Sequence, residues 1–430
     1  MKYPIGNEMH SWACDLFPIC RSITGDGVRK TLNYIKNLLP SLTVHEVSSG
    51  TKAFDWTVPD EWNIRDAYVE DENGDRIIDF KQHNLHVVSY SEPVDVWLSL
   101  EELDKRLYSL PDQPNAIPYV SSYYKRWWGF CLTHQQRLKL KPGKYHAVID
   151  SSLKPGSLSY GELILPGTEE KEVLLSTYIC HPSMGNNELS GPVVTTALAR
   201  WLLNLDERRY TYRIVFVPET IGSIVYLSRN LEIMKKNTVA GFVVTCIGDD
   251  RSYSFSHSPW GDTLADRVAQ HVLKHHAPNY FNYYFWEKGG SDERQYCSPN
   301  VRLPVVSVMR SRYGTYPEYH TSLDDLSFIT SSGLEGGYEA LRKCLIVLEN
   351  NRYYKVPFPC EPQMGKRGLK PLLSLKNTEQ PSTMMRLLNY LDGEHDLLQV
   401  CDQIGRFIID CIPIVNKLLD EKLLVKKYGG

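Results

Sequence analysis

Apolar strands that alternate with helices between residues 161 and 350 constrain the fold of this chain most strongly. Short apolar runs typical of buried strands occur at residues 173–179, 212–217, 239–246 and 304–309, and residues 190–203 have the pattern of a helix. Strands that are apolar throughout are typical of a sheet covered on both faces. The region therefore predicts a mixed or parallel α/β sheet flanked by helices.

Two other patterns flank this region. Residues 56–152 consist of short segments separated by turn signals such as DENGDR and KPGK, which predicts a small β sandwich or jelly roll. A segment rich in Pro, Lys and Gly (356–371) is a predicted linker, and the three short helical patterns and apolar tail beyond it fit a winged helix. A helix-compatible stripe at residues 27–39 packs most simply on the α/β sheet.

We therefore expect three domains in this chain of 430 residues. The α/β domain comprises residues 1–55 and 155–352. An all-β domain, residues 56–154, is inserted between its two parts, and residues 360–430 form the winged-helix domain.

The composition argues against several classes of protein. Lys and Arg number 48 and Asp and Glu number 51, so the formal net charge of -3 argues against a dominant polyanion-binding role. The 10 cysteines form no CxxC pair, which is typical of reduced thiols. We see no secretory signal and no apolar run near the roughly 18 residues that span a bilayer. We expect a cytoplasmic protein without a membrane segment.

The winged helix is expected to bind a protein. Residues 402–416 (DQIGRFIIDCIPIVN) contain one Arg and two Asp. Contact with phosphates needs several basic side chains. We therefore expect a protein partner for this module and not nucleic acid.

The strongest chemical signal is TYICHPSMGNNELSG, residues 177–191. His181 follows a predicted buried strand, and in open α/β sheets the ligand crevice lies outside the carboxyl ends of strands. Asn187 and Glu188 lie in the loop that follows, and an imidazole with a nearby carboxylate is typical of metal sites. The alternative is that Asn187 and Ser190 only cap the next helix.

Two other core strands are also followed by ionisable side chains. Glu219 follows VFVP and is suited to act as a general base, although the start of a helix also favours a glutamate through the helix dipole. His320, in YPEYHTSLDD, follows the strand at 304–309, and the alternative is a histidine in a surface loop. Ionisable side chains thus follow three separate core strands, and this repetition favours a metal-dependent hydrolase.

The segment GGSDERQYCSP, residues 289–299, lies between core strands. Asp292, Glu293 and Arg294 offer charges of both signs, and an arginine can bind a carboxylate through two hydrogen bonds. We expect these three residues to contact substrate. The alternative is an exposed turn with local ion pairs.

In combination, CHPSMGNNELSGP, PETIGS, GGSDERQYCSP and EYHTSLDDL resemble bacterial polysaccharide biosynthesis proteins with an aminopeptidase-like domain, and more distantly the zinc aminopeptidases with two co-catalytic metals. The resemblance covers essentially the whole chain. It implies a zinc-aminopeptidase-like fold, with His181 and His320 as the first and last histidine ligands and Glu219 as the general base. It also implies a link to cell-surface polysaccharide synthesis.

The chain departs from the aminopeptidase pattern at three ligand positions. Asn187 stands at the position of the bridging aspartate, Thr220 at that of a second glutamate and Thr245 at that of another aspartate. Two divalent cations close together need bridging negative charge, so these neutral residues predict one zinc ion.

For that ion we expect His181, Glu188 and His320 as ligands. Asn187 or Asp249 would serve as a further ligand or as a hydrogen-bonding neighbour.

The favoured function is metal-dependent hydrolysis of an amide bond in a short peptide or an amino-sugar-type substrate. The alternative is a catalytically degenerate peptidase fold kept as a binding or regulatory module, which the three neutral positions support. A transcription regulator that uses the winged helix is a third, weaker interpretation.

Overall fold

The computed structural model describes residues 5–287, 289–369 and 379–427. The chain divides into two compact units. Unit 1 runs to Asp266 and includes Phe281–Tyr338, and unit 2 comprises Arg267–Tyr280 and the chain from Glu339 onward. Two helices, α7 (Leu264–His276) and α9 (Ser331–Asn350), have residues in both units.

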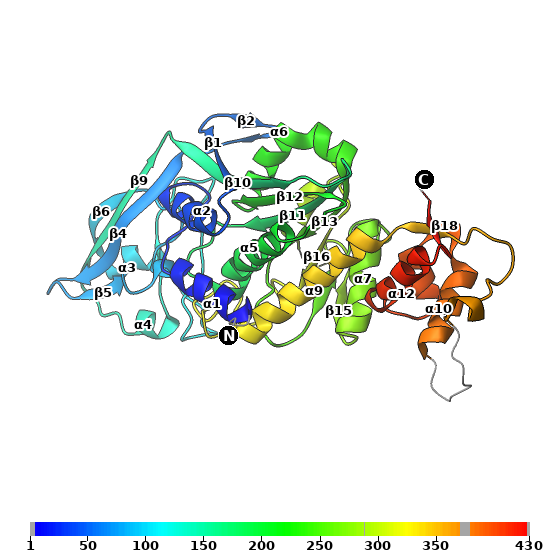
Figure 1. Ribbon diagram of the computed structural model, residues 1–430. Coiled ribbons are helices and arrows are strands. Elements are labelled where there is room, and N and C mark those ends of the chain that lie inside the picture. The colour runs from blue at the N-terminus through cyan, green and yellow to red at the C-terminus, as the bar shows by residue number, and fades with distance from the viewer. Residues whose placement is uncertain (1–4, 288, 370–378, 428–430) are drawn as a thin grey trace. The chain divides into compact units, whose positions relative to one another are not determined.

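An eight-stranded mixed sheet forms the centre of unit 1 (Figure 1). Its four middle strands are parallel, and strands on either side of these are antiparallel to their inner neighbours. The strands, in spatial order, are β1 (Thr43–Ser48), β10 (Ser157–Leu165), β12 (Thr211–Val217), β11 (Glu172–Tyr178), β13 (Thr238–Val243), β16 (Val305–Met309), β14 (Ser254–Ser256) and β15 (Phe281–Tyr283). This arrangement confirms the predicted mixed α/β architecture.

Helices cover both faces of the sheet, as apolar strands require. On one face Gly191 packs so closely on Thr177 that a Cβ at residue 191 would lie 2.4 Å from the threonine hydroxyl. Side chains alternate along a strand, so Ser176 points to the other face, where its hydroxyl lies 2.9 Å from that of Tyr296. The helices that lie wholly in unit 1 and outside residues 56–154 are α1 (Ile5–Leu16), α2 (Asp26–Leu38), α5 (Ser190–Leu203), α6 (Ile221–Asn237) and α8 (Glu293–Tyr296). A π-helical turn, η2 (Gly185–Leu189), precedes α5.

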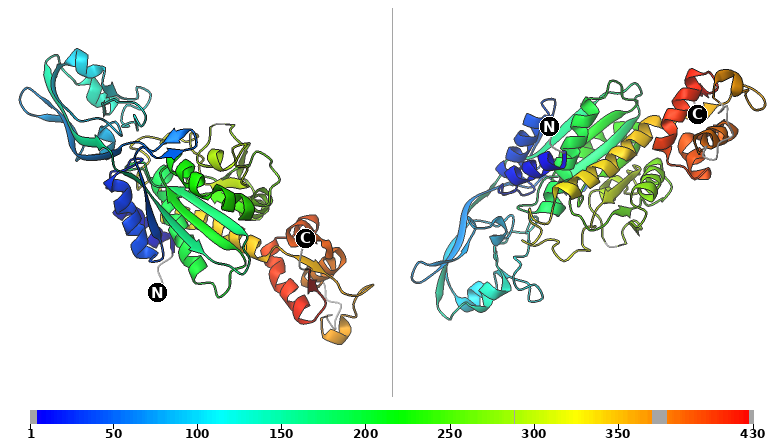
Figure 2. Two further views of the ribbon diagram at one scale, coloured as in Figure 1. Left: turned by 90° about the horizontal axis from the view of Figure 1, so that it is seen from above. Right: turned by 60° about the horizontal axis from the view of Figure 1, so that its bottom comes forward.

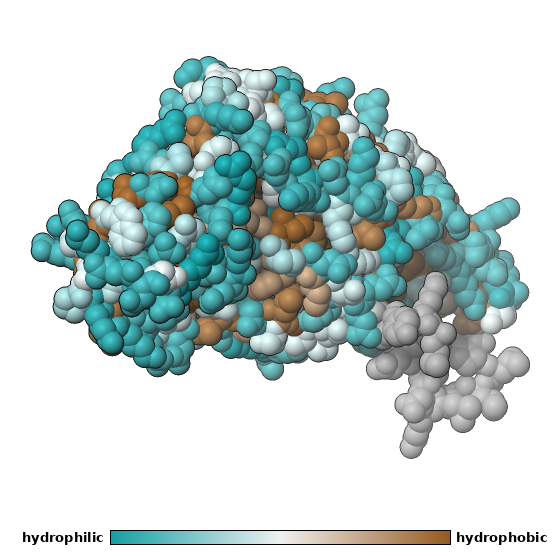
Figure 3. Space-filling model, turned by 90° about the vertical axis from the view of Figure 1, so that its left-hand side faces the viewer, coloured by the Kyte–Doolittle hydropathy of each residue, from teal (hydrophilic) through white to brown (hydrophobic). Residues whose placement is uncertain are grey.

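Residues 56–154 contain a separate four-stranded antiparallel sheet, β5 (Arg76–Asp79), β4 (Glu61–Asp71), β9 (Lys144–Lys154) and β6 (Val94–Ser99) in spatial order. It extends to one side of the large sheet (Figures 1 and 2), and the face that it presents is mainly hydrophilic (Figure 3). Shorter elements accompany it: β2 (Lys52–Ala53), β3 (Trp56–Thr57), β7 (Leu107–Tyr108), β8 (Phe130–Cys131), α3 (Leu100–Asp104), α4 (His134–Leu138) and η1 (Asn84–His86). We call residues 56–154 the insert, and the domain bounds stay a prediction.

Unit 2 combines three helices with a small antiparallel sheet. Its elements are α10 (Glu379–Tyr390), α11 (Leu397–Gln403) and α12 (Ile408–Asp420), the strands β18 (Asp392–Asp396), β17 (Tyr353–Lys355) and β19 (Val425–Lys426), and η3 (Gly365–Arg367). His271 of α7 joins this unit: its Nδ1 lies 2.6 Å from Asp402, and its Nε2 accepts a hydrogen bond from the Ile408 amide. The end of the predicted linker, 370–371, and the end of the predicted tail strand, 428–430, lie outside the described residues.

Within the described ranges, no helix is both long and apolar enough to cross a bilayer.

Candidate functional site

His181, Glu219 and His320 meet at the carboxyl edge of the parallel strands. His181 follows the end of β11 by three residues, and Glu219 follows the end of β12 by two. His181 Nε2 lies 3.6 Å from Glu219 Oε2, and the rings of His181 and His320 are 5.5 Å apart between centroids. Three segments that are distant in the sequence therefore bring two imidazoles and one carboxylate together.

The backbone around this cluster is strained. His320 has φ 57°, Thr220 has φ 65° and Ser183 has φ 40°, all in the left-handed region that side-chain-bearing residues rarely adopt. Such conformations persist where the surrounding structure holds them, and they collect at functional sites. The strain thus supports a functional reading of the cluster.

A buried chain of charges orients His181. Its Nδ1 lies 3.0 Å from Glu188 Oε2, and Arg21 Nε lies 3.4 Å from the other oxygen of Glu188. Arg21 also donates a hydrogen bond of 2.9 Å to the backbone carbonyl of His181. Burial lowers the pKa of His181, but the hydrogen bond and charge of Glu188 outweigh it and raise the pKa. Glu188 thus binds the ring nitrogen opposite the one that faces Glu219.

His320 offers an unused ring nitrogen. Its Nε2 is buried and has no hydrogen-bond partner among the residues that the structure describes. Burial, followed by the proximity of His181, lowers the pKa of His320 to about 3, so the ring is neutral near pH 7. Tyr119 of the insert lies edge-on to both histidine rings, and its amide donates a hydrogen bond to the His320 carbonyl. A buried neutral imidazole with a free nitrogen fits a metal ligand.

Neutral groups occupy the positions where aminopeptidases carry further carboxylates. The hydroxyl of Tyr178 lies 2.5 Å from the Thr245 hydroxyl and accepts a hydrogen bond of 2.8 Å from the Asn187 amide group. Thr220 accepts a hydrogen bond from Arg294 at 2.5 Å. These groups are uncharged and add no negative charge for a second cation, and among the described residues the side-chain oxygen of Asn187 is buried and has no hydrogen-bond partner.

Asp249 is engaged away from the histidines. Its carboxylate accepts hydrogen bonds from the Asn186 side chain and from the amide and hydroxyl of Ser311. The structure therefore does not bring Asp249 into contact with His181. Asp324, which was not predicted as a site residue, holds the amides of Asn186 and Asn187, and burial raises its pKa to about 7.

The segment from Ser291 to Arg294 borders Glu219. Ser291 donates a hydrogen bond of 2.7 Å to Glu219, and Asp292 accepts hydrogen bonds from the Thr220 amide and the Ser223 hydroxyl. Burial and then the charge of Glu219 raise the pKa of Asp292 to about 7. Asp292 and Glu293 are buried, whereas Arg294 is half-buried and lines an open pocket.

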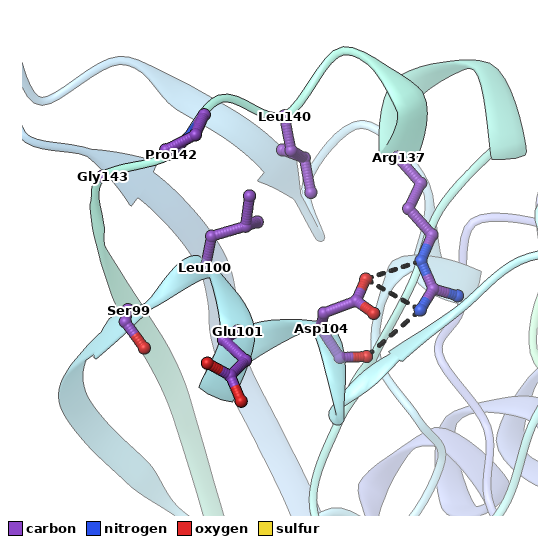
Figure 4. A pocket seen from close by; sticks show the side chains of 8 residues that line it. All are labelled: Ser99, Leu100, Glu101, Asp104, Arg137, Leu140, Pro142 and Gly143. Carbon is purple, nitrogen blue, oxygen red and sulfur yellow. Dashed lines mark hydrogen bonds and ion pairs between the residues drawn. The ribbon is translucent and has the colours of Figure 1, made fainter.

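Another open pocket, of about 520 Å³, lies within the insert (Figure 4). Its charged side chains Arg137 and Asp104 pair with each other at 2.8 Å, and Leu100 and Leu140 point into it. The residues that line this pocket do not include those predicted for the site.

Comparison with known proteins places the chain in a family. Residues 10–351 match the model of a family described as a domain of unknown function, DUF4910, and residues 352–426 match that of a winged helix-turn-helix. A Clostridium acetobutylicum protein described as a candidate polysaccharide biosynthesis protein with an aminopeptidase-like domain is 46% identical over 406 residues, which cover 93% of this chain and 92% of that protein. This chain belongs to the same family. The family resemblance and the winged helix predicted from the sequence are thereby confirmed.

Solved structures extend the comparison. A Clostridium acetobutylicum crystal structure described as a candidate peptidase has a TM-score of 0.93 and 44% identity. The match covers 98% of the present chain and 96% of that chain. A zinc aminopeptidase from Bacillus subtilis has a TM-score of 0.58 at 10% identity, covering 80% and 94%. An aminopeptidase from Aneurinibacillus sp. strain AM-1 has a TM-score of 0.52 at 13% identity, covering 80% and 93%. The two aminopeptidases confirm the predicted fold and carry no further conclusion.

Proposed function

We propose that this chain hydrolyses an amide bond in a peptide or an amino-sugar-type substrate, with Glu219 as general base and one zinc ion held by His181 and His320. The observation that carries the proposal is the meeting of these three side chains at one edge of the sheet. The aminopeptidase-like fold and the names of the relatives support it.

We assign one metal ion to the two histidines. Among the described residues, His320 Nε2 is buried and has no hydrogen-bond partner, and His181 Nε2 is turned towards Glu219. We assign Glu188 to the orientation of His181, because it binds the opposite ring nitrogen and is paired with Arg21. A zinc ion bound here supplies Lewis acidity for the amide carbonyl. With two histidine ligands, we expect weaker binding than at a structural zinc site, which has four protein ligands.

The carboxylate of Glu219 performs the proton transfers. It is partly exposed, so water and substrate can reach it, and Ser291 fixes one of its oxygens through a hydrogen bond. As general base it takes a proton from the attacking water and delivers it to the nitrogen of the leaving amine. The carboxylate gains this proton in the first transfer and releases it in the second, so it is regenerated.

Substitution of the base tests the proposal. A panel of aminoacyl amides and acyl-amino-sugar amides identifies a substrate, and Glu219→Gln is then expected to lower kcat on it by about 10² to 10⁴-fold, the usual contribution of a general base. Glu232→Gln, which changes an exposed glutamate of α6, serves as the matched control. A Glu219→Gln protein with unchanged kcat contradicts the mechanism.

The neutral network of Asn187, Tyr178 and Thr245 favours a second candidate, a peptidase fold retained for binding or regulation. In that case the winged helix provides a docking surface for a protein partner. This candidate predicts that the purified chain holds no zinc and hydrolyses none of the amides in the panel.

A further inference from the structure

An open pocket of about 520 Å³ lies beside Arg294. Its lining combines three aromatic side chains with two arginines and small polar groups, and it includes no Asp or Glu. The lining residues come from three stretches of unit 1, at positions 259–260, 285–286 and 294–302, and the aromatic ones are Trp260, Phe285 and Trp286. The pocket is therefore aromatic and positively charged.

The two arginines lie against the aromatic rings. The guanidinium of Arg294 is 5.9 Å from the ring centre of Trp286, and that of Arg302 is 5.4 Å from the ring centre of Trp260. Within the part of the chain that the structure describes, the Nε of Arg294 is buried and has no hydrogen-bond partner. The hydrogen bonds within the protein therefore do not use all the donors of this guanidinium.

The carboxylates next to Arg294 in the chain do not neutralise it. Asp292 holds the Thr220 amide and the Ser223 hydroxyl, and Glu293 accepts a hydrogen bond of 2.6 Å from the Tyr313 hydroxyl. The positive charge therefore stays available to an anion that enters the pocket.

Short links connect this pocket to the proposed general base. Arg294 donates a hydrogen bond to the hydroxyl of Thr220, the residue after Glu219, and Ser291 donates one to Glu219 itself. A substrate group held by Arg294 is thus fixed by the same segment that positions the base.

We propose that this pocket binds an acidic sugar, a pyranose that carries a carboxylate, as part of the substrate. The inference rests on the proposed amide hydrolysis and names its substrate class. A guanidinium recognises a carboxylate through paired, charge-assisted hydrogen bonds. Tryptophan rings present an apolar face to the C–H side of a pyranose, and Gln295 and Ser298 offer groups that hydrogen-bond hydroxyls.

Titration of the full chain with three small molecules tests the proposal by calorimetry or saturation-transfer NMR. D-glucuronate is expected to bind. D-glucose, which lacks the carboxylate, is expected to bind at least about tenfold more weakly, because it loses a charge-assisted hydrogen bond. Phenylacetate, which has a carboxylate and no hydroxyls, is also expected to bind more weakly than glucuronate. Equal affinity for glucose, or tighter binding of phenylacetate, overturns the assignment to an acidic sugar.

Two variants locate the site, and two controls match them. Arg294→Gln and Trp286→Ala are each expected to weaken glucuronate binding about tenfold or more. Trp97→Ala is the matched control, since Trp97 is 54% exposed and Trp286 is 53% exposed. Arg65→Gln changes an exposed arginine of the insert. Both controls should bind as the unchanged chain does.

Unchanged binding by both pocket variants, or no binding of glucuronate by the unchanged chain, overturns the inference. Circular dichroism and the Tm of each variant exclude a loss of folding as the cause of weaker binding. The titration measures binding alone, so Glu219→Gln should bind glucuronate normally, and a failure of hydrolysis is distinguishable from a failure of this pocket.

Discussion

At the scale of single residues, two buried charged side chains hold His181 in place. Arg21 and Glu188 are fully buried, and Glu188 contacts both Arg21 and the imidazole. Removing one partner of a buried ion pair leaves an uncompensated charge, which costs more than the pair contributes. Because Arg21 is fully buried and paired with Glu188, its loss should destabilise the folded state.

We predict that Arg21→Met lowers the free energy of unfolding by about 3 kcal/mol. A second substitution, Glu188→Gln, should recover part of this loss because it removes the unpaired charge. Urea unfolding followed by circular dichroism measures both effects. Arg65→Met breaks an exposed pair with Asp150 and should cost clearly less than Arg21→Met. Equal costs at Arg21 and Arg65 would refute the prediction.

The residues of the site differ in how far the sequence reveals them. His181 and Glu219 follow core strands, and strand ends are readable from apolar runs. Arg21 reaches His181 across 160 positions, and Tyr119 reaches His320 from within the insert. No local pattern encodes such contacts, because they depend on how separate segments pack.

At the scale of elements, close packing of α5 on the sheet places the loop that carries Asn187 and Glu188. Gly191, at the start of α5, is the point of closest approach: a Cβ there would lie 2.3 Å from the carbonyl oxygen of Val244. This oxygen belongs to the backbone, which cannot move aside as the end of a flexible side chain can. A side chain at residue 191 would therefore force α5 to shift.

We predict that Gly191→Ala lowers the free energy of unfolding by about 1–3 kcal/mol through overpacking. Gly143→Ala is the control, since the nearest atom to a Cβ at residue 143 is 3.6 Å away. Thermal unfolding of the two variants compares them. A Tm of Gly191→Ala as high as that of the control would show that α5 does not pack as described.

An ion pair joins α2 to strand β4 of the insert. Glu61 accepts hydrogen bonds from Arg29, and these lower the pKa of Glu61 to about 2. A carboxyl group with a depressed pKa stabilises the folded state above its unfolded pKa of about 4.5, and this contribution is lost as the pH falls towards 2.

We predict that Glu61→Gln costs about 1 kcal/mol at pH 7, a value reduced for the partial exposure of the pair, and clearly less at pH 3. Urea unfolding at the two pH values measures the difference. If Glu61→Gln lowered the free energy of unfolding equally at pH 7 and pH 3, the charge of Glu61 would not contribute to stability.

Elements also differ in how well the sequence reveals them. Helix α5 and the strands β11, β12, β13 and β16 fall where apolar runs predict them, within a few residues. The apolar pattern of the sequence does not predict helix α6, because its first seven residues are all buried and show no amphipathic stripe. The short helices of the insert are capped by local hydrogen bonds and carry too few residues for a period to show.

At the scale of the whole molecule, the chain joins an aminopeptidase-like unit to a winged helix. The exposed residues of α12 include Asp410, Asn416 and Asp420, with Lys417 as the exposed basic residue. A helix face with one exposed lysine and two exposed aspartates offers few contacts to phosphates.

We therefore predict that the full chain shows no binding to a random DNA duplex at about 150 mM salt in a fluorescence anisotropy titration. Binding whose affinity falls steeply with salt would contradict this, because that dependence is the mark of contacts to phosphate.

The account depends most on a metal held by His181 and His320, and zinc content measures this directly. Protein purified without chelator and dialysed to equilibrium against buffered zinc should bind about one equivalent above the free ion by elemental analysis. His181→Ala and His320→Ala should each lose it, whereas Glu188→Gln should keep zinc with about 10 to 100-fold lower affinity, as expected for a residue that orients a ligand. Less than about a tenth of an equivalent in the unchanged chain would contradict the central claim.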